Sequence, residues 1–179
     1  MLFACIKKIM FPCFAPPNSS DEECSGFRLV DETTKWEDTE VFTFPAGNYR
    51  VIKCYDGDTI TVAFRTPGDD QIYRQGVRLD GIDCPELHPK QGNSSDKQLE
   101  SERECAQLAQ KFVADLILGK VVCLSNIKHE KYGRALATVS IDGINLNKML
   151  VANRLAVAYD GGTKICPSDW MKYYCTGYV

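Results

Sequence analysis

Short runs in which apolar and polar residues alternate follow one another from Tyr49 onward, and they limit the fold more than any other feature. The alternation is clearest over 60–64 and 77–79, and further strands are predicted at 121–127 and 134–141. Thr66-Pro-Gly-Asp-Asp70 is a turn signal, and Asp142-Gly143 is a tight-turn signal. Arg78 lies between two apolar residues of its run, so its side chain is expected on the opposite face. About five short strands with interspersed helices predict an α+β domain built on a small β-barrel.

Helical patterns account for the rest of this domain. A loop at 88–97 leads to a helix that Ser95 and Gln98 could cap. Its apolar residues are spaced to give one buried face, and Gly119 ends it. These residues are Cys105, Leu108, Ala109, Phe112, Val113, Leu116 and Ile117. Two shorter helices are predicted, at 147–153 and after Ser168-Asp169, which gives about three packed helices.

The chain divides by composition into three parts. We expect an apolar, cysteine-containing segment at 1–17, an acidic linker at 18–46, and a folded domain at 47–179 that includes the C-terminal helix. The net charge of −3 argues against nucleic-acid binding through global electrostatics. Residues 1–46 hold 4 Lys+Arg and 8 Asp+Glu, so the remainder holds 21 − 4 = 17 against 24 − 8 = 16. Attraction for phosphate must therefore be local.

The N-terminal segment is too short and too interrupted for a transmembrane helix. Cys5 and Cys13 could be acylated and associate the chain with a membrane. Alternatively, the segment could be a frayed terminus or could pack on its own domain. Nine cysteines without zinc spacing favour a reduced, intracellular (cytoplasmic) protein over a disulfide framework, although secretion stays open. Cys166 and Cys175 could pair, but nothing in the sequence requires it.

Carboxylates at predicted strand ends are candidates for a metal site. Asp58 follows Gly57, which permits a tight turn, and Asp83 ends a strand. Hard oxygen ligands suit Ca²⁺ or Mg²⁺. Glu86 is three residues beyond Asp83 and could act as a base on a metal-adjacent water. The alternatives are a simple hairpin turn at Asp56-Gly57-Asp58 and a solvated loop position for Glu86.

Arg78 and Arg134 are candidate phosphate clamps, because a guanidinium presents a bidentate fork to phosphate and stays charged. Each, taken singly, would more often be a surface residue. Tyr132 could stack on a base or bond a phosphate, and Lys131 could add charge. Both could equally be solvated turn residues.

The order D-G-D-T, R-L-x-G-I-D-x-P-E and K-Y-G-R-x-L-A resembles the staphylococcal nuclease (thermonuclease-like) family from about Tyr49 to Tyr159. The resemblance implies a five-stranded OB-type barrel and a calcium-dependent endonuclease that cleaves DNA and RNA to leave 3′-phosphate ends. By position, Asp58 and Asp83 resemble the metal carboxylates, and Cys84 stands where a backbone carbonyl binds the metal. Arg78, Glu86 and Arg134 resemble the catalytic trio, and Asp56 resembles an outer-shell acid. The remaining matches lie near substrate phosphates: Lys131, Tyr132 and Tyr159.

The sequence departs from the family pattern at Cys84, where a threonine is usual, and in the loop 87–99. Some relatives have lost the catalytic residues and serve as binding modules. The alternative function is therefore a non-catalytic OB-type module for nucleic acid. The catalytic interpretation is preferred because none of the metal and catalytic side chains is lost, namely Asp58, Arg78, Asp83, Glu86 and Arg134. We expect a monomer.

Overall fold

The computed structural model describes residues 33–40, 42–66, 70–92, 94–130, 133–162 and 166–178. The chain separates into two compact units, Met1–Thr39 and Glu40–Val179. The described part of the first unit contains one 3₁₀ turn, η1 (Trp36–Asp38), with no buried residue. The predictions made for Cys5, Cys13 and the segment 1–17 lie outside the described residues.

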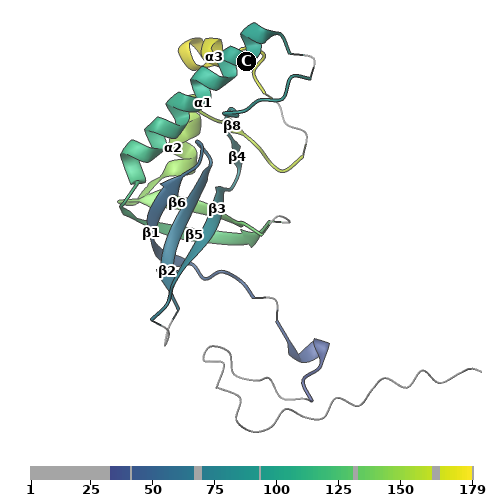
Figure 1. Cartoon of the computed structure of the whole chain (residues 1–179), viewed down its shortest axis with the longest axis vertical. Coiled ribbons are helices and arrows are strands. Elements are labelled where there is room, and N and C mark those ends of the chain that lie inside the picture. The colour runs from purple at the N-terminus through teal and green to yellow at the C-terminus, as the bar shows by residue number, and fades with distance from the viewer. Residues whose placement is uncertain are drawn as a thin grey trace, which may run out of the picture. The chain divides into compact units, whose positions relative to one another are not determined.

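A closed β-barrel forms the centre of the second unit (Figure 1). Five of its strands pair in the order β3-β2-β1-β5-β6, and a parallel pairing of β3 with β6 closes the cylinder. These strands are β1 (Gly47–Cys54), β2 (Thr59–Arg65), β3 (Ile72–Leu79), β5 (Val121–His129) and β6 (Ala135–Ile141). Short strands complete the fold: β7 (Ile144–Asn145) beside β6, and β4 (Ile82–Asp83) paired with β8 (Val157–Ala158). The α+β, OB-type barrel expected from the sequence is confirmed.

The barrel core follows from the period-two pattern. Val62, Val77 and Leu79 are fully buried, and the residues that alternate with them face outward. The same parity explains why Cys123 is exposed although it lies in an apolar run, because its neighbours Val122 and Leu124 take the inward positions. An aromatic cluster, in which Phe44 packs on Tyr49 and Phe64, also belongs to the core.

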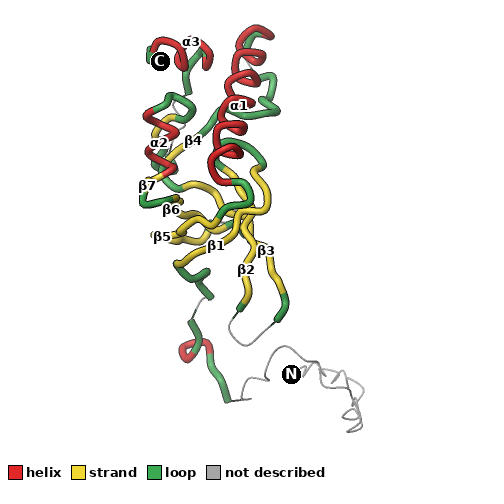
Figure 2. The backbone as a smooth tube through the Cα atoms, turned by 90° about the vertical axis from the view of Figure 1, so that its left-hand side faces the viewer, coloured by secondary structure: helices red, strands yellow, loops and turns green. Residues whose placement is uncertain are grey.

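Three helices lie at one end of the barrel, opposite the end where β2 finishes and β3 begins (Figure 2). They are α1 (Asp96–Ile117), α2 (Leu146–Ala152) and α3 (Trp170–Thr176). Ser95 caps α1 in a reciprocal pair with Gln98, as expected. Leu108, by contrast, is 37% exposed, because the face of α1 that contacts the barrel is narrower than predicted. None of the helices in the described part of the chain has both the length and the apolar content needed to cross a bilayer.

Candidate functional site

Asp58 is held in the loop between β1 and β2, where it is 3% exposed. Its own N–H donates to Asp56 Oδ1 at 3.1 Å, and its Oδ2 accepts from the Cys84 N–H at 3.0 Å. Gly57 lets this loop approach α1 closely. A Cβ placed on Gly57 would lie 2.8 Å from both Ala109 Cβ and Cys84 Sγ, distances that real Cβ atoms essentially never show. Packing therefore requires glycine at position 57. The close approach places Asp58 beside Cys84, the first residue after β4.

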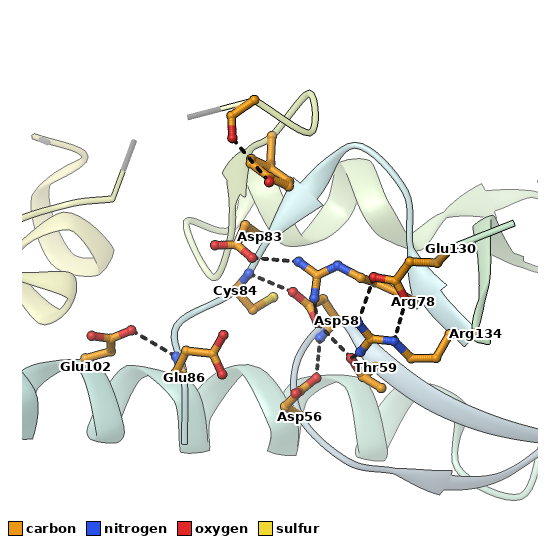
Figure 3. A network of polar contacts seen from close by, with 12 residues as sticks. Asp56, Asp58, Thr59, Arg78, Asp83, Cys84, Glu86, Glu102, Glu130 and Arg134 are labelled. Atoms are coloured by element: carbon orange, nitrogen blue, oxygen red, sulfur yellow. Dashed lines mark hydrogen bonds and ion pairs between the residues drawn. The ribbon is translucent and has the colours of Figure 1, made fainter. Parts of the chain in front are cut away.

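Arg78 joins two buried carboxylates that come from different parts of the chain (Figure 3). Its Nη1 donates to Asp58 Oδ1 at 2.8 Å, and its Nη2 donates to Asp83 Oδ1 at 2.6 Å. Asp83 lies in β4 and is 4% exposed. The outward direction predicted for Arg78 brings its guanidinium between the two aspartates. The structure thus places the two candidate metal ligands next to each other, with a cation from the chain itself between them.

The cluster carries more negative than positive charge. Three carboxylates, from Asp56, Asp58 and Asp83, surround the single guanidinium of Arg78. Burial and the nearby Asp58 charge raise the pKa of Asp56 to about 6. Burial by itself lowers the pKa of Arg78, but the charges of Asp58 and Asp83 outweigh it, so that pKa is raised. Burial and then the three carboxylates raise the pKa of the Cys84 thiol well above its ordinary value. This excess of negative charge favours binding of an additional cation.

Arg134 precedes β6 and lies on the outer side of β3. A Cβ placed on Gly76 would lie 3.4 Å from Arg134 Cγ, so the side chain of Arg134 crosses β3 at this glycine. Its Nε and Nη2 donate to the two carboxylate oxygens of Glu130, at 2.6 and 2.8 Å. Its Nη1 donates to the Thr59 hydroxyl at 3.3 Å, and that hydroxyl in turn donates to Asp58 Oδ1 at 3.0 Å. Arg134 is thereby linked to the aspartate cluster.

Glu130 is a residue that the sequence reasoning missed. The only feature of the sequence that pointed to Glu130 was its position four residues before Arg134. In the structure the Gly133 N–H donates to the Glu130 carbonyl at 3.1 Å, which closes a turn between the two residues. In a turn rather than a helix that spacing is not by itself predictive, because only helices bring residues four apart together as a rule. Glu130 is also only 18% exposed in its side chain, so the pair with Arg134 is partly shielded from water.

Glu86 lies after β4, on the solvent side of the cluster, and it is exposed. Its backbone N–H donates to the Glu102 carboxylate of α1 at 3.1 Å, which ties the chain at Glu86 to the helix (Figure 3). Tyr159 is half-buried, its N–H donates to the Gly81 carbonyl at 3.0 Å, and its hydroxyl donates to the Gly162 carbonyl at 3.3 Å. Lys131 and Tyr132 lie outside the described residues.

The donor set can be tested against the divalent cation that the sequence predicts. Within the described ranges, no group of three or more His, Cys, Asp or Glu side chains is arranged to hold a metal ion. Asp58 and Asp83 nevertheless supply two adjacent carboxylates, and a backbone carbonyl at Cys84 would add a third hard oxygen donor. Together with the excess negative charge, these donors fit a hard divalent cation, because each carboxylate has lone pairs beyond the one that accepts from Arg78.

Comparison with known proteins is consistent with this arrangement. The family model for the staphylococcal nuclease homologue matches residues 76–169, a range that includes Arg78, Asp83, Glu86 and Arg134. A protein of Escherichia coli O157:H7 named "Uncharacterized endonuclease" is 30% identical over 112 residues, which is 62% of this chain and 60% of that protein. A protein of the same name from Haemophilus influenzae (strain Rd) is 34% identical over 110 residues, 62% of this chain and 51% of that protein. The chain therefore spans between half and three fifths of the length of these two relatives. Because the family model matches more than half of the chain, this chain belongs to the staphylococcal nuclease homologues.

Proposed function

We propose that this protein is a calcium-dependent endonuclease that hydrolyses phosphodiester bonds of DNA and RNA and leaves 3′-phosphate ends. One observation carries the proposal: Arg78 lies between two buried carboxylates, with Arg134 joined to the same cluster through Thr59. Two guanidiniums beside a cluster of hard oxygen donors are the groups that phosphodiester hydrolysis needs. The family membership and the names of the two relatives support a nuclease without specifying metal or products.

In this proposal each residue has a separate task. Asp58, Asp83 and the Cys84 carbonyl would hold Ca²⁺, which when bound polarises the scissile phosphate. Glu86 orients a water molecule and takes its proton as the water oxygen attacks phosphorus. The P–O5′ bond breaks, and O5′ takes a proton from solvent water and departs as the 5′-hydroxyl of the downstream nucleotide.

Arg78 and Arg134 bind the phosphate and stabilise the negative charge that develops on it. Arg78 uses one N–H of each terminal nitrogen on Asp58 and Asp83, so the other three of its five N–H groups can donate to phosphate oxygens. Arg78 can therefore hold both carboxylates and bind a phosphate at the same time.

The test is cleavage of single-stranded and duplex DNA by the full chain, with Ca²⁺ and with a calcium chelator. We expect degradation that stops in chelator, and that falls by at least a hundredfold in Glu86→Gln and Arg134→Ala, as is typical when a transition-state contact is lost. Lys172→Ala, an exposed position in α3, is the control and should behave as wild type. Product ends that a polymerase extends only after phosphatase treatment would show 3′-phosphates. Full activity in Glu86→Gln would refute the site assignment.

The second candidate is a non-catalytic module that binds nucleic acid on the OB-type barrel. It is favoured by the observation that Arg78 and Arg134 are both already paired with carboxylates. Binding that persists in chelator, without any cleavage in Ca²⁺, would select this candidate.

Three accompanying hypotheses concern the whole chain. We propose an intracellular, monomeric protein, with membrane association through Cys5 and Cys13. A double variant Cys5→Ser/Cys13→Ser that partitions between membrane and soluble fractions like wild type would remove the membrane hypothesis. Sedimentation analysis of the purified chain tests the monomer.

A further inference from the structure

We infer that Glu102 of α1 is a positioning residue that holds Glu86 at the candidate site. Its carboxylate accepts a hydrogen bond from the Glu86 backbone N–H at 3.1 Å, and this bond sets the point from which the Glu86 side chain extends. The inference rests on the proposed function, in which Glu86 takes the proton of the attacking water. It adds to the catalytic arrangement a residue that the sequence analysis did not assign to the site.

The segment that carries Glu86 is held by side chains rather than by a sheet or a helix. Among the described residues, the chain between β4 and α1 enters no helix or strand. The Cys84 N–H donates to Asp58 Oδ2 at 3.0 Å, and Pro85 has no N–H to donate. The next backbone donor is the Glu86 N–H, and its acceptor is Glu102. Two carboxylates from other parts of the chain therefore hold this segment, one on each side of Pro85.

The carboxylates of Glu86 and Glu102 lie on opposite sides of the Glu86 backbone (Figure 3). Glu102 reaches the N–H from α1, whereas the Glu86 side chain extends toward the side on which Cys84 and Asp58 lie. A hydrogen bond to an ionised carboxylate is stronger than one between neutral groups. Because like charges repel, Glu102 also disfavours a Glu86 side chain that turns back toward α1. Both effects direct Glu86 toward the aspartate cluster.

The part of α1 that carries Glu102 is itself fixed, by contacts with the start of α3. The neighbouring Ser101 is buried, and its hydroxyl donates to Asp169 Oδ1 at 2.5 Å, at the N-terminus of α3. Three residues earlier in α1, Gln98 Nε2 donates to the Ser168 carbonyl at 3.1 Å. The acceptor for Glu86 thus belongs to a packed helix rather than to the loop that follows Glu86. A residue that positions another needs support of this kind.

Loss of this hydrogen bond should affect the chemical step more than substrate binding. A general base must lie about 2.6–3.2 Å from the water that it activates, and a displacement of about 1 Å can cost up to a hundredfold in rate. Phosphate binding depends instead on Arg78 and Arg134, which come from β3 and from the residue before β6. We therefore expect a variant without the Glu102 acceptor to lose kcat and to keep its KM.

The experiment compares Glu102→Ala, Glu102→Gln and the control Glu104→Ala in the full chain. Alanine removes the acceptor, whereas the amide oxygen of glutamine keeps an acceptor in the same place without the charge. Glu104 is exposed and, two residues along α1, leaves the helix in a different direction, and its replacement removes the same charge. Because alanine is the best helix former, both alanine variants should fold with the Tm of wild type.

The rates are measured on single-stranded DNA in Ca²⁺. In Glu102→Ala we expect kcat to fall about tenfold, with KM within about twofold of wild type. Glu102→Gln should lie within about threefold of wild type, because the hydrogen bond is kept but weakened. Glu104→Ala should match wild type. In a Glu86→Gln background, Glu102→Ala should cause no further loss, because no base remains to be positioned.

A second measurement needs no activity. Hydrogen exchange of the Glu86 backbone amide, followed by NMR on the ¹⁵N-labelled chain, reports directly on the bond to Glu102. We expect this amide to exchange at least about tenfold faster in Glu102→Ala than in wild type, and to stay protected in Glu102→Gln and Glu104→Ala.

Four results would overturn the inference: wild-type kcat in Glu102→Ala, an equal loss in Glu104→Ala, a loss in Glu102→Gln as large as in Glu102→Ala, or an added loss in the Glu86→Gln background. If wild type and Glu102→Ala cleave DNA equally well, the proposed function stands and the inference fails. If wild type cleaves nothing, the proposed function fails. Faster amide exchange in Glu102→Ala would then still support Glu102 as the residue that holds Glu86, and unchanged exchange would overturn that as well.

Discussion

Replacing Gly57 by alanine tests the close approach that positions Asp58. The added Cβ would lie 2.8 Å from Ala109 Cβ and Cys84 Sγ and 3.1 Å from Cys84 Cβ. Favourable contacts between non-bonded carbon atoms are about 3.5 to 4.0 Å, so the backbone at Gly57 must move by several tenths of an ångström. Neither neighbour can yield easily, because Ala109 Cβ is fixed to the backbone of α1 and Cys84 is buried.

Overpacking of this kind costs about 1 to 3 kcal/mol in other cores. For a unit of this size that corresponds to a decrease in Tm of about 2 to 12 °C. The displacement also reaches Asp58, the next residue, so we expect weaker Ca²⁺ binding in Gly57→Ala by isothermal titration calorimetry.

Gly92→Ala is the matched control, because a Cβ at Gly92 meets no atom within 4 Å. Thermal unfolding followed by circular dichroism should show a Tm within about 2 °C of wild type, or slightly above it, since alanine also restricts the unfolded chain. A Gly57→Ala protein that melts with the control and binds Ca²⁺ normally would refute the packing argument.

Two further predictions concern Glu130 and Cys105. The substitution Glu130→Gln leaves the Arg134 guanidinium with one acceptor oxygen in place of two. Under the proposed function we expect kcat to fall by about tenfold, which is the free energy of about one charge-assisted hydrogen bond. In an Arg134→Ala background the same change should have no further effect, and additive losses would show that Glu130 acts independently of Arg134. Burial raises the pKa of Cys105 to about 12, so at pH 9 its thiol should react with iodoacetamide much more slowly than the exposed Cys123, as read by mass spectrometry. Rapid labelling of Cys105 in the native protein at pH 9 would contradict its burial. Because the pKa of Cys105 is higher in the folded state, the stability that this residue contributes is complete below pH 9 and is lost as the pH rises toward 12.

The sequence alone determined the elements of the barrel and the candidate chemistry. Alternation over β2 and β3 sets which side chains face inward, and it correctly placed Arg78 away from Val77 and Leu79. The Ser95–Gln98 pair at the start of α1 was also predictable. All of these features depend on interactions between residues close in sequence, which local periodicity and capping rules describe.

Only the tertiary structure decided which side chains meet. The closure of the barrel by β3 and β6, the bridge from Arg78 to Asp58 and Asp83, and the contact between Glu86 and Glu102 all join residues from different elements. No local pattern encodes these pairings, because they depend on how a closed sheet brings strand ends, loops and α1 to the same place. Glu130 and Arg134 are only four residues apart in the sequence, yet their pairing also depends on the conformation of the turn between them. The chemistry of the site was therefore predictable residue by residue, whereas its geometry required the fold.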